Sequence, residues 1–323
     1  MPAIKFPSVQ PQADFAALLR DARNQFLQPA LANAVRSLDI ELLDRELAVL
    51  VPAAALRDFS ARGLRGELLF ATPCVIRANP RLIGYYRLVL GFSQKSFYAT
   101  GAGTGAFKSA EAQGKLSAAA ERLLNDLCDG LIPAAVTLLA ALSVHDETRA
   151  ALHELSLLTL GAQFRGGRNN QLGEAGISRV FDLFREIVSK SIISVDTGVI
   201  EVKNAAKRRV LIAFAPDPDI VIQMEMKSGQ YRPVIAVEIK AGTDYSNIHN
   251  RLGEAEKSHQ KAHAADFQEC WTVINVDLGD AEAKKASPST NRFYQLSKLE
   301  KRSGPIYEDF KDRIISLTGI KSK

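Results

Sequence analysis

The sequence predicts an α/β (α+β) protein in which helices flank a mixed central β-sheet, with a mainly helical region before it. Two observations carry this prediction. Residues 12–60 and 113–144 repeat apolar side chains at spacings of three and four, which is typical of amphipathic helices. After about residue 155, short segments rich in β-branched residues alternate with turn residues, which is typical of strands joined by hairpins. We therefore expect two regions, 1–150 and 151–323.

The first region contains one segment that the pattern leaves open. Between residues 64 and 98, LLFATPCVI fits either a strand or a buried turn of helix, and Pro73 and Pro80 cut it short. The region as a whole is expected to be mainly helical. No residue pattern in this region indicates a chemical reaction.

The second region opens with a polar stretch that we expect to form a loop at 165–171, followed by an amphipathic helix at 175–190. Later elements are assigned from β-branched runs and from apolar residues at helical spacing. Strands are expected within 192–202, 208–214, 219–226, 233–240 and 271–276, and helices at about 247–267, 290–300 and 307–318.

Composition narrows the class of protein. Lys and Arg number 41 against 36 Asp and Glu, and a net charge of +5 permits a polyanionic partner without requiring one. Three scattered cysteines do not form a disulfide framework, which favours a reducing, cytoplasmic location. The start of the chain lacks the apolar core of a secretory signal, and the longest apolar run, 131–142, is shorter than the roughly 20 residues of a membrane span. We expect no membrane association.

The sequence does not support three other kinds of functional site. GAGTGAFKS at 101–109 lacks the glycine spacing of a phosphate-binding P-loop, so a flexible loop is expected there. The G-x-S-x-G sequence that is typical of many serine hydrolases does not occur in the chain. His259 and His263 lie four residues apart on one expected helix, but no third zinc ligand stands near them in the sequence.

The strongest signal lies at the ends of two expected strands. Pro218-Asp219 opens one apolar run, and Glu238-Ile239-Lys240 closes the next. If residues 219–226 and 233–240 pair with a turn between Gly229 and Gln230, Asp219 lies opposite Lys240. Because strand side chains alternate, Asp219, Glu238 and Lys240 then project from one face at one end of the hairpin. Charged groups at the rim of an apolar sheet are poorly explained by packing, although an exposed salt bridge is the simpler alternative.

This arrangement suits hydrolysis of a phosphodiester. Two carboxylates supply hard oxygen ligands for one or two Mg²⁺ ions, which accept phosphate oxygens and lower the pKa of a bound water. A lysine beside them can orient or deprotonate the attacking water and oppose the negative charge that develops.

The same residues resemble the PD-(D/E)xK nuclease superfamily. The segments at 241–262 (AGTDYSNIHNRLGEAEKSHQKA), 85–98 (YYRLVLGFSQKSFY) and 165–170 (RGGRNN) are similar to type II restriction endonucleases, in particular to the XcyI-like group. The resemblance implies a sheet of restriction-endonuclease-like type and Mg²⁺-dependent, sequence-specific cleavage of double-stranded DNA, at CCCGGG in that group. It implies that Asp219, Glu238 and Ile239 hold the metal.

A further acidic residue is a candidate metal ligand. Glu174 falls on the apolar side at the start of the helix expected at 175–190. In the superfamily an acidic residue on a helix before the sheet often lies near the metal ions. The alternative for Glu174 is favourable placement of a carboxylate at a helix N-terminus.

Two polar segments are candidates for reading DNA. Arginine pairs with guanine and asparagine with adenine, whereas lysine suits phosphates. We expect Arg168 and Arg251 to contact bases, and Lys257 and Lys261 to contact phosphates. The full set of expected DNA contacts is Arg165, Arg168, Asn169, Asn170, Asn247, His249, Asn250, Arg251, Lys257 and Lys261.

The sequence therefore predicts a type II restriction endonuclease that acts as a homodimer, because a palindrome presents two cleavage sites related by a two-fold axis. The helical first region is expected to serve DNA binding, dimerisation or structure. Two alternatives stay open: a repair-type or structure-specific nuclease with the same core, and an inactive DNA-binding protein.

Overall fold

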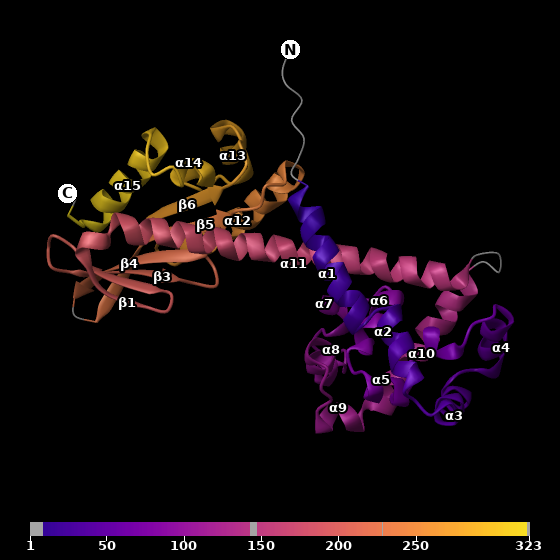
Figure 1. The fold of residues 1–323 in the computed structure, drawn as a ribbon. Helices are drawn as coiled ribbons and strands as arrows, with labels where there is room; N and C mark the ends of the chain where they lie inside the picture. Colours follow the sequence, from indigo (N-terminus) through magenta and orange to yellow (C-terminus); the bar gives the residue numbers. More distant parts are fainter. Residues whose placement is uncertain (1–8, 143–146, 228, 322–323) are drawn as a thin grey trace, which may run out of the picture. The chain divides into compact units, whose positions relative to one another are not determined.

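The computed structural model describes residues 9–142, 147–227 and 229–321 (Figure 1). The chain forms two compact units, Met1–Gly166 and Gly167–Lys323. One long helix, α11 (Thr148–Ile187), contributes residues to both. The predicted combination of a helical N-terminal region with a helix-flanked mixed sheet is confirmed.

The first unit is built from short helices. Two 3₁₀ turns, η1 (Gly66–Leu68) and η2 (Gly105–Phe107), lie between them. The segment LLFATPCVI, which the sequence left open, contains no strand: Leu68 ends η1, residues 69–72 form a short connection, and α5 begins at Pro73, a first-turn position that needs no N–H. The helices are α1 (Gln10–Gln25), α2 (Gln28–Arg36), α3 (Ile40–Leu50), α4 (Ala53–Ala61), α5 (Pro73–Ala78), α6 (Leu82–Val89), α7 (Gln94–Phe97), α8 (Lys108–Gln113), α9 (Ala118–Arg122) and α10 (Leu124–Ala141).

Helix α10 runs through the hydrophobic core of this unit. Leu124, Cys128 and Leu139 on α10 are buried among side chains of the surrounding helices. By length and composition alone, α10 is the one helix among the described residues that is apolar enough to cross a membrane, a test that core helices also pass. Cys128 and Cys74 are free and buried, and burial raises the pKa of these thiols to about 12 and about 11.

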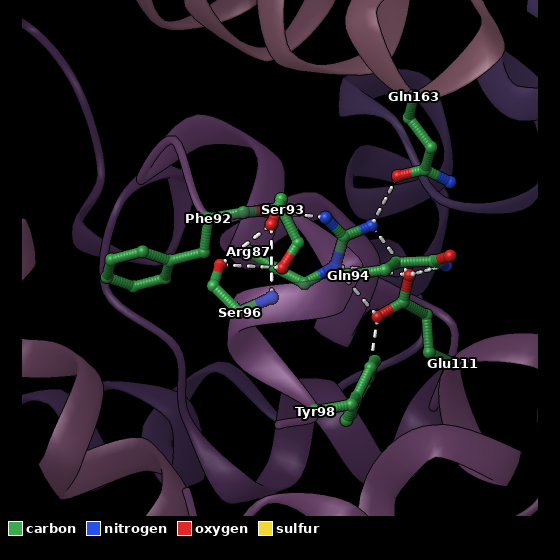
Figure 2. A network of polar contacts seen from close by, with 8 residues as sticks. All are labelled: Arg87, Phe92, Ser93, Gln94, Ser96, Tyr98, Glu111 and Gln163. Carbon is green, nitrogen blue, oxygen red and sulfur yellow. Dashed lines mark hydrogen bonds and ion pairs between the residues drawn. The ribbon is translucent and has the colours of Figure 1, made fainter. Parts of the chain in front are cut away.

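A buried ion pair links three helical segments of the first unit. Arg87 on α6 is 1% exposed, and its Nη2 lies 2.8 Å from Glu111 Oε1 on α8 (Figure 2). The same guanidinium donates to Gln163 Oε1 on α11 and to the Phe92 carbonyl. Tyr98 and Gln94 donate to the Glu111 carboxylate. Burial acts to raise the pKa of Glu111, but the hydrogen bonds and charge of Arg87 outweigh it and lower that pKa.

Replacing Glu111 by alanine should destabilise the first unit by about 3–5 kcal/mol, because Arg87 would be left buried without a counter-charge. The double variant Arg87→Met/Glu111→Leu should recover much of the loss, since no charge would then be buried. Denaturant unfolding followed by far-ultraviolet circular dichroism measures both. The fluorescence of Trp271, the single tryptophan, reports separately on the second unit. A decrease of less than about 1 kcal/mol in the free energy of unfolding of Glu111→Ala would contradict the stabilising role given to this ion pair.

The second unit contains a seven-stranded sheet in the order β1-β2-β3-β4-β5-β6-β7. Neighbours from β1 to β5 are antiparallel, and β5, β6 and β7 are parallel. The strands are β1 (Ile192–Asp196), β2 (Val199–Lys203), β3 (Arg209–Phe214), β4 (Ile220–Lys227), β5 (Gln230–Lys240), β6 (Glu269–Ile274) and β7 (Arg292–Gln295). Besides α11, the helices are α12 (Ile248–Ala264), α13 (Asp280–Ala286), α14 (Leu296–Leu299) and α15 (Pro305–Thr318), with 3₁₀ turns η3 (Ser189–Ser191) and η4 (Tyr245–Asn247).

Side-chain alternation along β5 assigns its two faces to different helices. Val237 packs in the main core with Phe184 of α11 and Phe310 of α15. Ala236 points the other way and packs against Ala262 of α12. Glu238 and Lys240 follow Ala236 at intervals of two, so they belong to the α12 side.

Three local predictions were wrong. The expected loop at 165–171 is part of α11, which continues unbroken through both glycines, Gly166 and Gly167. The helix expected at 290–300 begins as strand β7 and becomes helical only at α14. The hairpin register is shifted by two residues, since Val221 pairs with Ala236 rather than with Glu238. In the paired residues nearest Asp219, 220–222 with 235–237, a shift of two leaves each side chain on its predicted face, and a bulge between Ile222 and Gln223 changes the register beyond them.

Candidate active site

Asp219, Glu238 and Lys240 lie together at the ends of β4 and β5. Asp219 Oδ2 accepts a hydrogen bond of 2.7 Å from the Ile239 backbone N–H, which fixes the carboxylate against the end of β5. Glu238 is 7% exposed, and its Oε1 lies 2.8 Å from Lys240 Nζ. Lys240 also lies 3.6 Å from Glu254 on α12. The structure thus brings the three residues to one place, as predicted.

The charges of these groups are unevenly compensated. Burial raises the pKa of Asp219 to about 6, and the nearby charge of Glu238 adds to this effect. Burial acts to lower the pKa of Lys240, but the charge and hydrogen bond of Glu238 outweigh it and raise that pKa, so Lys240 is a cation at neutral pH. Among the residues that the structure describes, no cation forms an ion pair with Asp219, whereas Lys240 pairs with Glu238.

Ser258 of α12, which is not among the predicted site residues, holds Glu238 through a further set of polar contacts. Ser258 Oγ lies 2.9 Å from Glu238 Oε2 and also hydrogen-bonds Asp217. Asp217 in turn pairs with Lys261 Nζ at 2.6 Å, and the hydrogen bond from Lys261 holds the pKa of Asp217 below its usual value. Ser258 is buried. Its position three residues after Ala255 and four before Ala262 could have indicated this.

A pocket of about 410 Å³ opens beside these carboxylates. Asp219 and Lys240 line it together with α12 and α11. Glu174 also lines it, from an exposed position within α11 and not from a helix start as expected. Helix α11 comes this close because Gly176 has no side chain: a Cβ there would lie 2.1 Å from that of Ala241.

The residues present fit a hard divalent cation in part. Asp219 and Glu238 offer carboxylate oxygens at the end of β5, and burial beside Glu238 raises the pKa of Asp219, so a cation bound there would stabilise its charged form. Among the residues that the structure describes, no three His, Cys, Asp or Glu side chains form a ready-made metal cage. Magnesium usually takes one or two protein carboxylates and keeps several waters, so a pair suffices.

The expected DNA contacts are distributed unevenly. Asn169, Asn170 and Arg251 line the pocket. His249 lies 3.3 Å from Glu282, and Asn250 donates to Asn247, so these polar groups already have partners. Lys261 pairs with Asp217, and Lys257 is exposed. Arg168 is half-buried, and Arg165 belongs to the first unit.

The histidine pair on α12 has structural partners. His259 is fully buried, and its Nε2 lies 2.8 Å from the Thr272 hydroxyl on β6. His263 Nε2 lies 3.1 Å from the Ser289 carbonyl. Burial lowers the pKa of His259 to about 4, so the ring is neutral at physiological pH.

His259 should destabilise the second unit as the pH drops from about 6.5 to about 4. In this range the unfolded chain protonates His259 while the folded chain does not, so protons favour unfolding. This contribution should approach about 3 kcal/mol at the low end. Asp219 acts in the opposite direction, because its raised pKa makes the folded chain bind a proton in the same range. The His259 contribution is therefore read from the difference in free energy of unfolding between the unmodified protein and His259→Gln, measured by guanidinium unfolding with Trp271 fluorescence at pH 7.5, 5.5 and 4.5. The unmodified protein should lose stability relative to His259→Gln as the pH falls, and a difference that does not change with pH would contradict this account.

The mixed sheet, the helices on its two faces and the carboxylates at the end of β5 define a protein of the restriction-endonuclease-like fold class. Sequence comparison gives the particular family. The profile of the XcyI restriction endonuclease family matches residues 16–321. The chain is 51% identical over 323 residues to the type II restriction enzyme XcyI of Xanthomonas campestris pv. cyanopsidis, covering 99% of this chain and 97% of that one.

It is also 48% identical over 322 residues to the type II restriction enzyme Cfr9I of Citrobacter freundii, covering 99% and 98% of the two chains. The chain therefore belongs to the XcyI restriction endonuclease family. The predicted resemblance and the predicted enzyme class, a site-specific endonuclease, are confirmed.

Proposed function

We propose that this enzyme cuts both strands of DNA at a specific sequence by Mg²⁺-dependent hydrolysis, with Asp219, Glu238 and Lys240 as its catalytic residues. The observation that carries the proposal is their juxtaposition beside one pocket at the end of β5. The resemblance to the XcyI-like group makes CCCGGG the expected target. Three free, buried cysteines support action in the cytoplasm.

Each residue has a role that follows from its position. Asp219, Glu238 and the backbone of Ile239 would hold the metal, with Glu174 able to reach it through water from the pocket wall. The metal would supply an acidified water and neutralise charge on the phosphate. Lys240, held by Glu238 and Glu254, presents a positive charge to the negative charge that develops on the phosphate. Ser258 holds the second oxygen of Glu238 and so keeps its carboxylate in place.

Incubation with a long DNA and Mg²⁺, followed by sequencing of the fragment ends, tests the whole proposal. Fragments that all end within one short palindrome support it, and ends within CCCGGG support the finer assignment. Random ends, or cutting only at branched or damaged DNA, would favour a repair-type nuclease instead.

Asp219→Ala and Glu238→Ala should each lower the cleavage rate at least about 100-fold, because each removes a metal ligand worth several kcal/mol to the transition state. Binding of the same DNA in Ca²⁺ should persist. Lys240→Ala should also be inactive. Asp312→Ala, which removes an exposed carboxylate on α15, is the matched control. A Glu238→Ala protein that cuts at the normal rate would show that the active site lies elsewhere.

The enzyme should be a homodimer, because cleavage of both strands at a palindrome needs two sites related by a two-fold axis. Size-exclusion chromatography with light scattering should give twice the chain mass of 35.2 kDa. The measurement is made with and without DNA. A strictly monomeric protein under both conditions would contradict the prediction.

A further inference from the structure

Arg251 occupies an unusual position on the wall of the catalytic pocket. It projects from the first turn of α12 and lies against Gly242, just beyond the end of β5. A Cβ at Gly242 would lie 1.5 Å from Arg251 Nη1 and 2.3 Å from its Cζ. The guanidinium therefore occupies the space that a side chain at 242 would fill. Only glycine permits this placement.

The charges that line the pocket distinguish Arg251 from Lys240. Asp219, Glu174 and Glu254 contribute carboxylates, and the two lining cations are Lys240 and Arg251. Lys240 is already paired with two carboxylates, Glu238 and Glu254. Arg251 forms no hydrogen bond or ion pair with any residue in the described part of the chain. The cation that is available to an incoming anion is therefore Arg251.

We propose that Arg251, seated on Gly242, binds the non-bridging oxygens of a phosphate of the cleaved strand, and that it does not read a base. This inference rests on the proposed function, because it takes the pocket beside Asp219 and Lys240 as the place of the scissile phosphate. A guanidinium in that same pocket meets the DNA backbone. Its planar fork also matches two phosphate oxygens at once.

This role differs from the one that the sequence suggested for Arg251, and the two predict different measurements. A phosphate contact strengthens binding to every sequence, whereas a base contact strengthens binding to the target alone. A phosphate contact also releases counterions, so its loss reduces the slope of log affinity against log salt by about one.

Four variants test the proposal: Arg251→Ala, Arg251→Lys, Gly242→Ala and the double variant Arg251→Ala/Gly242→Ala. Affinity in Ca²⁺ is measured at several salt concentrations on a duplex with the cleavage site and on a scrambled duplex. Single-turnover cleavage is measured with Mg²⁺. The control is Gly253→Ala, which adds the same methyl group on α12 where no atom lies within 4 Å.

Arg251→Ala should weaken binding to both duplexes by the same factor, about tenfold or more, and lower the salt slope by about one. Gly242→Ala should reproduce this loss by displacing the guanidinium, and Arg251→Lys should keep the salt slope. The double variant should be no worse than Arg251→Ala, because both changes remove one interaction. Gly253→Ala should match the unmodified enzyme.

Three results would overturn the proposal. A loss confined to the target duplex would make Arg251 a base-reading residue. Normal binding by Gly242→Ala, or a further loss of affinity in the double variant, would show that Gly242 does not act by seating the Arg251 guanidinium. These outcomes differ from failure of the proposed function, in which the unmodified enzyme itself would cut no DNA.

Discussion

The site depends on how closely α11 approaches the end of β5. Gly176 allows that approach, because any Cβ there would collide with the side chain of Ala241. Ala241 directly follows Lys240, so the contact that fixes the helix also fixes the wall of the pocket beside Asp219 and Lys240. Farther along the helix, Phe184 packs into the main core of the sheet. One small residue thus connects the packing of the sheet with the shape of the site.

Charge balance explains why the carboxylates of the site are not equivalent. Glu238 is neutralised by Lys240 and held by Ser258, and Asp217 is neutralised by Lys261. From the described part of the chain, Asp219 receives a single hydrogen bond, from a backbone N–H, and its pKa is raised. In a buried setting such a group favours either a proton or a cation. Asp219 is thus the carboxylate at the pocket whose negative charge a bound cation would stabilise most, which suits a metal-dependent hydrolase.

Much of the site could be predicted from the sequence because side-chain alternation is insensitive to a register error of two. Asp219, Glu238 and Lys240 share a face under either pairing. The continuity of α11 could not be predicted: Gly166 and Gly167 resemble a helix break, yet the helix continues between apolar faces that are buried on both sides of them. Tertiary packing outweighs local propensity there. The Ser258 and Asp217 contacts depend on how α12 docks, which no local pattern specifies.

The three cysteines have a practical consequence. All are buried and free, and burial raises the pKa of Cys270 to about 12, as it also raises those of Cys74 and Cys128. Thiol-reactive dyes attack the exposed thiolate, so these native groups are protected while the chain is folded. A cysteine introduced at an exposed position such as Lys257 would be labelled selectively, without prior removal of the native ones. The enzyme is thus ready for site-directed fluorescent labelling as it stands.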